Sequence, residues 1–168
     1  MTGGVILGID PGTTGMGFAI LDASREPPVV IDRGLIPTPK LGTTAERLVA
    51  IGDAIDGLIA AHRPADLVLE RLNFNKNVKT AMLVAEARGI ALLCGARAGL
   101  KISEYTPQEV KLSVTGSGSA DKGQVQRMLH LVLRLEGPIT QDNVADAVAI
   151  ALTHAQRVRF AAAVARAQ

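Results

Sequence analysis

The sequence predicts a single α/β domain built on a mixed five-stranded sheet with helices on its faces. The chain has 168 residues, which is the length of one domain. Three short apolar runs separated by turn residues open it, a pattern typical of antiparallel strands. Helical and strand patterns then alternate, which predicts parallel crossovers and a sheet covered by helices.

Five strands are predicted from apolar, β-branched runs bounded by glycine and proline. They are residues 5–9, 15–21, 29–35, 65–70 and 102–105. The turn Asp10-Pro11-Gly12 joins the first two as a hairpin. The last two strands are reached through helical segments, which favours a parallel arrangement for them.

Helices are predicted where apolar residues recur at a spacing of three or four. The predicted helices are residues 44–63, 78–98, 107–114, 122–135 and 143–155. Thr43 and Glu46 form a capping-box pattern, and Pro64 ends the first helix. We take residues 1–157 as the domain and 158–168 as an Ala/Arg-rich C-terminal segment that either continues the last helix or frays.

Composition excludes several classes of protein. Apolar residues make up 48% and charged residues 20% of the chain, which is ordinary for a folded domain. No apolar run reaches the ~18 residues that would span a bilayer, and the start lacks a signal-peptide pattern, so we expect a cytoplasmic protein. The single cysteine, Cys94, lies in an apolar helical run and is expected to be a core residue.

Charge is unevenly distributed. The net charge is +2, but residues 71–101 carry six basic side chains and one acidic one, directly after an acidic segment. A solvated helix face is the simplest interpretation of such a run.

Two carboxylates are predicted at neighbouring strand ends. Asp10 follows the first strand, and Glu70 ends the apolar strand Leu67-Val68-Leu69. Taken alone, Asp10 is slightly better explained as a turn residue than as a ligand. Glutamate is disfavoured in strands, and strand carboxyl ends are where α/β sheets bind ligands, so we expect the pair to face one crevice.

A third carboxylate, Asp146, falls in the first turns of the last helix, near Asp142 and Asn143. Asp142 is also explained as a helix cap. Asp146 is flanked by Ala and Val, where a carboxylate needs a partner. Three oxygen-bearing groups without a His or Cys cage suit Mg²⁺ or Mn²⁺. Two such ions activate water for phosphodiester hydrolysis, so nuclease chemistry is the leading hypothesis.

Over nearly its whole length the chain resembles the RuvC family of bacterial Holliday-junction resolvases, which have an RNase H-like fold. Four motifs carry the resemblance, in the family's order and spacing. They are residues 8–12 around Asp10, Leu69-Glu70 with Asn75-Lys76-Asn77, the Gly-rich loop 115–122, and residues 145–154 around Asp146.

The resemblance implies a homodimeric endonuclease that makes paired, symmetric, metal-dependent nicks in four-way DNA junctions, leaving 5′-phosphate and 3′-hydroxyl ends. It implies about two Mg²⁺ or Mn²⁺ ions per active site. It also implies cooperation with the RuvA–RuvB branch-migration complex in recombination and repair, and action on the nucleoid. The implied catalytic and metal-binding residues are Asp10, Glu70, Asn143 and Asp146. Lys111 and Lys122 fall where the family has lysines near the scissile phosphate.

Two positions depart from the family. The family residue three positions before the last Asp is usually Asp and sometimes His, whereas here it is Asn143. An amide is a poorer ligand than a carboxylate, so either the second metal ion binds more weakly or Asp142 rotates in to complete the site. An aromatic residue that stacks on a junction base is expected at position 73, but the aromatic here is Phe74. Phe74 beside Arg71, Lys76 and Lys79 is our candidate DNA contact, with core packing as the alternative.

The second predicted helix carries two stripes of small residues at four-residue spacing. They are Ala81-Ala85-Gly89 and Ala87-Ala91-Gly95. The resemblance implies dimerisation through this helix, and packing against the sheet must explain at least one stripe.

Three other functions are each suggested by part of the sequence. The Asp10 motif also resembles the phosphate loop of sugar kinases and actin-like ATPases, but one domain lacks their second lobe. A RuvC-like ribosomal RNA-processing nuclease is a second alternative, which the Gly-rich loop with Lys122 disfavours. A junction-binding protein whose cleavage is weakened or lost through Asn143 is the third.

Overall fold

The computed structural model describes residues 4–12, 15–36, 42–71 and 78–167. In this part of the chain five strands form one sheet, in the order β3-β2-β1-β4-β5. They are β1 (Val5–Pro11), β2 (Met16–Asp22), β3 (Val29–Ile36), β4 (Asp66–Glu70) and β5 (Lys101–Tyr105). β1 and β2 are antiparallel, as are β2 and β3, whereas β4 runs parallel to both β1 and β5. The predicted mixed sheet is confirmed.

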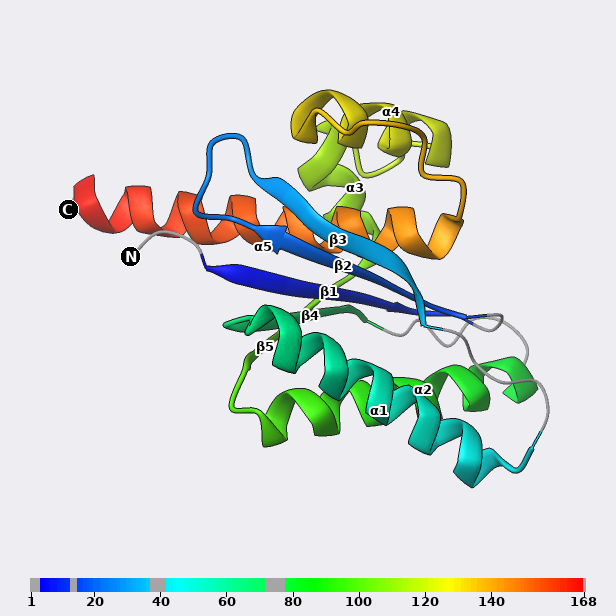
Figure 1. Cartoon of the computed structure of the whole chain (residues 1–168). Helices are drawn as coiled ribbons and strands as arrows, with labels where there is room; N and C mark the ends of the chain where they lie inside the picture. Colours follow the sequence, from blue (N-terminus) through cyan, green and yellow to red (C-terminus); the bar gives the residue numbers. More distant parts are fainter. Residues whose placement is uncertain (1–3, 13–14, 37–41, 72–77, 168) are drawn as a thin grey trace.

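Five helices flank the sheet, as predicted. They are α1 (Thr44–His62), α2 (Val78–Arg97), α3 (Pro107–Thr115), α4 (Lys122–Leu133) and α5 (Asp142–Ala167). α1 and α2 cover one face, and α5 crosses the other beneath α3 and α4 (Figure 1). None of the helices in these ranges is long and apolar enough to cross a membrane.

Local sequence signals define where three helices begin. Thr43, Thr106 and Asp121 each accept a hydrogen bond from the backbone N–H three residues on, and each is closed by a reciprocal capping box. The Asp121 cap makes Lys122 the first residue of α4. Capping therefore determines the position of one of the predicted site lysines.

The alternation of side chains along the strands divides the core in two. Leu7 and Ile9 of β1 pack with Leu67 and Leu69 of β4 beneath α1 and α2. Ile6, just before Leu7, and Val68, between Leu67 and Leu69, point to the other side and pack in the core cluster that includes α5. This alternation directs Asp10 and Glu70, the next residues of the α5-facing series, toward α5.

α5 lies close against the sheet. A Cβ at Gly8 of β1 would lie 2.5 Å from the backbone oxygen of Ala147, so only glycine fits there. Farther along α5, His154 is buried and its Nδ1 shares a 2.7 Å hydrogen bond with the Tyr105 hydroxyl of β5. These contacts determine how the start of α5 lies over the strand ends.

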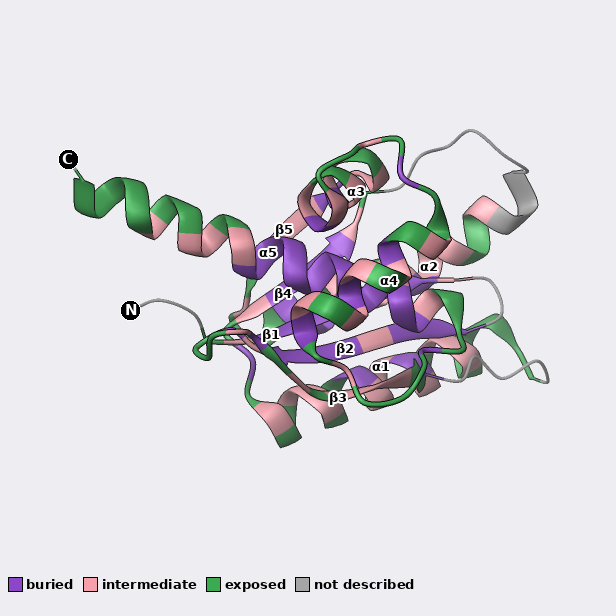
Figure 2. Cartoon of the chain, turned by 90° about the horizontal axis from the view of Figure 1, so that it is seen from above, coloured by how far each residue is buried: buried purple, intermediate pink, exposed green. Residues whose placement is uncertain are grey.

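The C-terminal segment does not fray in this structure: α5 continues without interruption through Ala167. Its last turns extend beyond the sheet and are exposed, whereas the turns over the sheet are buried (Figure 2). Cys94 is buried in the core beneath α1 and α2, as predicted.

Candidate active site

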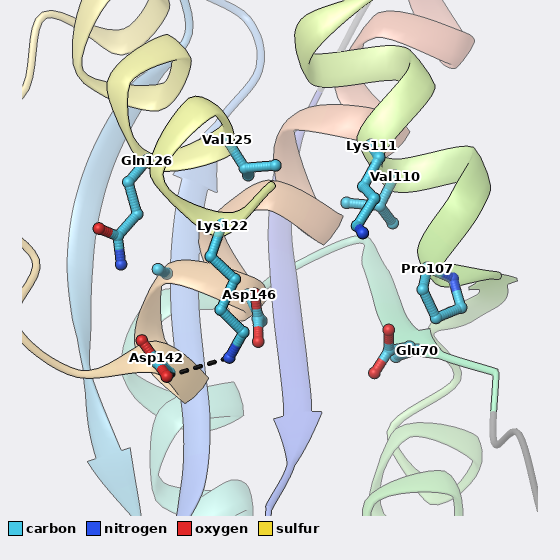
Figure 3. Close-up of a pocket in the computed structure, with 10 residues that line it drawn as sticks. Glu70, Pro107, Val110, Lys111, Lys122, Val125, Gln126, Asp142 and Asp146 are labelled. Atoms are coloured by element: carbon cyan, nitrogen blue, oxygen red, sulfur yellow. Dashed lines mark hydrogen bonds and ion pairs between the residues drawn. The ribbon is translucent and has the colours of Figure 1, made fainter. Parts of the chain in front are cut away.

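A cleft of about 170 Å³ opens where β4 ends and α3, α4 and α5 begin. Its lining residues are Glu70, Pro107, Val110, Lys111, Lys122, Val125, Gln126, Asp142, Ala145 and Asp146. Acidic and basic side chains enter it from four different elements (Figure 3). The cleft therefore combines three of the predicted carboxylates with both predicted lysines.

Asp10 lies beside this cleft on the adjacent strand. Ile9 of β1 pairs with Leu69 of β4, so Asp10 and Glu70 are the next residues of two parallel neighbours. Asp10 is only 7% exposed. The predicted juxtaposition of Asp10 and Glu70 follows from this register.

Burial, and to a smaller extent neighbouring acids, raise the pKa values of the carboxylates at the site. Burial is the main cause of the shift at Asp10, and the charges of Asp146 and Glu70 add to it, so its pKa rises to about 8. The pKa values of Glu70 and Asp146 are also raised, in both cases mainly by burial. A buried group of carboxylates that resist ionisation is stabilised by a nearby cation.

Lys122 is the positive charge that acts on all three of the acids Asp10, Glu70 and Asp146. Its Nζ donates a 3.0 Å hydrogen bond to Asp142 Oδ2, and both side chains are largely exposed. This bond is the main cause of the raised pKa of Lys122. Lys122 lowers the pKa values of Asp10, Glu70 and Asp146, and Lys111 lowers that of Asp146.

Asn143 lies at the start of α5, where its amide group contacts the β1–β2 hairpin. Its Nδ2 donates a 2.8 Å hydrogen bond to the backbone oxygen of Gly15. The nitrogen end of the amide is thus engaged, and Oδ1 remains the ligand atom to consider for a metal.

The donor set of the cleft is chemically suited to hard divalent cations. Asp10, Glu70 and Asp146 supply carboxylate oxygens and Asn143 supplies an amide oxygen, which are ligands that Mg²⁺ and Mn²⁺ accept. Within the described residues, no three His, Cys, Asp or Glu side chains converge closely enough to form a single-ion cage. The fit of these residues to divalent cations therefore rests on the types of ligand atom present and on the grouping of several acids in one place.

Three helices begin at this cleft. Pro107, Lys122 and Asp142, all lining residues, are the first residues of α3, α4 and α5. Helix N-termini carry partial positive charge, which adds to that of Lys111 and Lys122. The cleft thus brings acids from β4 and α5 together with the lysines and helix N-termini that can stabilise an anion.

Only some of the residues predicted to contact DNA lie in the described part of the chain. Arg71 is exposed directly after β4, and its backbone N–H bonds the Tyr105 carbonyl. Lys79 lies in the first turn of α2, but its side chain, like Phe74 and Lys76, lies outside the described residues.

Sequence reasoning missed Gln126, which lines the cleft one helical turn after Lys122. The i, i+4 spacing of the two residues was a usable signal. It also missed how tightly the hairpin glycines surround Asn143, because no local pattern indicates that contact.

Comparison with known proteins shows the family to which this chain belongs. The family model for crossover junction endodeoxyribonuclease RuvC matches residues 6–154. The chain is 44% identical over 156 residues to the RuvC of Alkaliphilus oremlandii, covering 93% of this chain and 95% of that protein. It is 45% identical over 150 residues to that of Petrotoga mobilis, covering 89% and 92%.

Solved structures agree. Thermus thermophilus RuvC matches with a TM-score of 0.86 and 29% identity over 94% of this chain and 96% of that one. The same protein in complex with Holliday junction substrate matches with a TM-score of 0.87, 29% identity and the same coverage. The RNase H-like architecture implied by the sequence resemblance is thereby confirmed, and the chain belongs to the RuvC family of crossover junction endodeoxyribonucleases.

Proposed function

We propose that this protein resolves four-way DNA junctions by paired, symmetric nicks that leave 5′-phosphate and 3′-hydroxyl ends, and that it serves recombination and repair. The observation that carries the proposal is the cleft itself. Asp10, Glu70 and Asp146 come from two adjacent strand ends and one helix start, and two lysines stand opposite them. Family membership, and the relative solved with a Holliday junction substrate, support DNA junctions as the substrate.

We assign Asp10, Glu70, Asp146 and Asn143 Oδ1 as the groups that hold two Mg²⁺ or Mn²⁺ ions. Bound ions would supply an activated water and stabilise the leaving oxygen. The carboxylates contribute the charge that retains such ions in a partly buried cleft. Their raised pKa values support this assignment, because burial, and to a smaller extent neighbouring acids, disfavour the ionised carboxylates, and a cation would stabilise that ionised form.

Lys122 and Lys111 orient the phosphate and stabilise the negative charge that develops on it. Lys122 is the better placed of the two, because its charge reaches Asp10, Glu70 and Asp146 alike. Its partner Asp142 lies at the mouth of the cleft, so a DNA phosphate arriving there competes for the same ammonium group.

We assign the binding of DNA beyond the scissile phosphate to the segment that follows Glu70. Arg71, Lys76 and Lys79 would contact backbone phosphates, and Phe74 would stack on an unpaired base. The exposure of Arg71 at the end of β4 supports a phosphate contact.

A homodimer through α2 completes the proposal. Ala87, Ala91 and Gly95 are buried against the sheet, so this stripe serves internal packing. On the outer face, Gly89 faces open space, and Met82 and Leu93 are exposed by 60% and 44%. A two-fold dimer would present two active sites to a two-fold junction. We further place the protein in the cytoplasm, on the nucleoid, working with RuvA–RuvB.

One other candidate function is favoured by a specific observation. Asn143 is neutral and its amide nitrogen already bonds Gly15, so the metal site has one charge fewer than an Asp would give. A protein that binds junctions but cleaves them poorly or not at all would follow if that charge were essential.

The test is cleavage of a synthetic four-way junction by the purified protein, with Mg²⁺ and Mn²⁺ supplied separately. Duplex DNA, single-stranded DNA and an RNA hairpin serve as competitors. Symmetric nicks confined to the junction support the proposal. Tight junction binding without cleavage under either metal supports the alternative, and preferred cleavage of the RNA hairpin would contradict both.

A further inference from the structure

Asn143 lies in close contact with three glycines of the β1–β2 hairpin, which are Gly12, Gly15 and Gly17. A Cβ at Gly12 would lie 2.2 Å from Asn143 Nδ2, and a Cβ at Gly17 would lie 2.0 Å from the Asn143 backbone oxygen. No residue larger than glycine fits at either position beside this asparagine. The hairpin and the first turn of α5 are therefore in direct contact at Asn143.

A hydrogen bond completes this contact. Asn143 Nδ2 donates to the backbone oxygen of Gly15 over 2.8 Å, and both residues are shielded from solvent in part or in full. Asp10 is the second-last residue of β1 and pairs with Gly17 of β2, and Asp146 lies one helical turn after Asn143 in α5. The bond therefore ties together the two elements that carry these carboxylates.

The partner of Asn143 is a carbonyl oxygen, so the bond requires a donor. A carboxylate of the same shape has none when ionised, and would place two acceptors against each other. Asparagine is thus suited to this contact in a way that aspartate is not.

We propose that Asn143 is a positioning residue: its amide joins the β1–β2 hairpin to the start of α5 and so sets the relative placement of Asp10 and Asp146. This inference rests on the proposed function, which assigns those two carboxylates to the active site. It gives the amide two ends with separate tasks, the nitrogen for the hairpin and Oδ1 for a metal ion.

The two tasks predict opposite effects of one substitution. If position 143 acted only as a metal ligand, Asn143→Asp would add charge, tighten Mn²⁺ binding and speed cleavage. If Asn143 positions the hairpin, Asn143→Asp loses the bond to Gly15, and Mn²⁺ binds more weakly despite the added charge.

The decisive experiment is hydrogen–deuterium exchange of the metal-free protein, followed in the peptide covering residues 5–19. We expect the amides of this peptide to exchange about tenfold faster in Asn143→Ala, which removes the bond without adding charge. Asn143→Asp should show at least the same increase, and calorimetry should show weaker Mn²⁺ binding to it. Thr140→Ala, at an exposed site just before α5, is the matched control and should exchange like the wild type.

Unchanged exchange in Asn143→Ala would overturn the proposal, as would tighter Mn²⁺ binding by Asn143→Asp. The proposed nuclease function is tested separately, by junction cleavage with the wild-type protein. A wild-type protein that fails to cleave but whose Asn143→Ala variant loosens the hairpin would refute the function and retain the contact. Cleavage by the wild type together with unaltered exchange in Asn143→Ala would support the nuclease function and refute the positioning role of Asn143.

Discussion

Asp10 is the acid at the site that the fold perturbs most strongly. It is the most buried of the acids, and its pKa of about 8 reflects burial first and then repulsion from Asp146 and Glu70. Removing its charge should therefore change cleavage and DNA binding in different directions.

We expect Asp10→Asn to abolish cleavage, because the amide is neutral and a weaker ligand for a hard cation. Junction binding should stay equal or become tighter, since less negative charge faces the phosphates. Cleavage and gel-shift assays on the same junction separate the two effects. Loss of binding together with cleavage in a folded variant would contradict the assignment.

Lys122 should contribute to the rate rather than to the fold, because it is largely exposed and bonds only Asp142 among the described residues. We expect Lys122→Ala to lower kcat by roughly 10²–10³-fold, the usual effect of losing one charge-stabilising donor. Single-turnover cleavage measures it. Lys101→Ala, at the opposite end of the parallel strands, is the control and should cleave normally.

The pKa of Asp10 also predicts how stability depends on pH. The carboxyl titrates near 3.8 when unfolded and near 8 when folded. Between these values the folded protein holds a proton that the unfolded chain releases, so the stabilisation is complete at low pH and is lost as the pH rises toward 8. Glu70 and Asp146 act in the same direction.

We therefore expect the Tm of the metal-free protein to fall between about pH 5 and pH 8, and Asp10→Asn to flatten that dependence. Adding Mn²⁺ at pH 8 should raise Tm, because the ion binds the ionised carboxylates of the folded state. Scanning calorimetry with a chelator or with metal measures both. A Tm that rises steadily with pH in the chelator would refute the coupling.

At the level of secondary-structure elements, the site depends on how closely α5 approaches the sheet. Gly8 permits the approach in the middle of β1, and Asn143 and His154 tie α5 to β1–β2 and to β5. α5 thereby carries Asp146 to the strand ends where Asp10 and Glu70 lie.

Gly8→Ala should destabilise the protein by about 1–3 kcal/mol, the usual cost of overpacking a core. The added Cβ would lie 2.5 Å from the Ala147 oxygen and 3.0 Å from the Ala151 Cβ, so α5 must shift. Gly57→Ala in α1 is the matched control, because a Cβ added there would meet no neighbouring atom within 4 Å. It should stabilise the protein by about 0.5–1 kcal/mol through better helix propensity. Urea denaturation measures both, and equal effects would mean that α5 adapts to the methyl group.

For the molecule as a whole, the fold separates the two surfaces that the proposed function needs. Residues of β4, α3, α4 and α5 line the cleft. α2 lies on the opposite face of the sheet from α3, α4 and α5 (Figure 1). A dimer through α2 would therefore leave both clefts accessible to DNA.

We expect Leu93→Glu to convert a dimer to monomers, because it places a charge on the exposed apolar side of α2. Nicking should become unpaired, with single nicks replacing coordinated ones. Sedimentation measures the oligomeric state, and a supercoiled cruciform substrate reports the pairing of nicks. Leu131→Glu, on α4 and 72% exposed, is the matched control and should remain dimeric.

The sequence alone predicted the ten elements and their order, because capping boxes, proline breakers and apolar periodicity act within a few residues of chain. It also singled out Asp10, Glu70 and Asp146, because carboxylates at the ends of apolar runs need partners, whereas Lys111 and Lys122 were implied only by the family resemblance. Family resemblance added their roles.

Contacts between distant segments could not be predicted in this way. Tertiary packing decided that Ala87, Ala91 and Gly95 face the sheet, that Lys122 bonds Asp142, and that Asn143 bonds Gly15. It also decided that α5 continues to Ala167. Each of these depends on which surfaces meet when the sheet and helices assemble. Local patterns specify the elements, whereas the assembled fold specifies which side chains become neighbours.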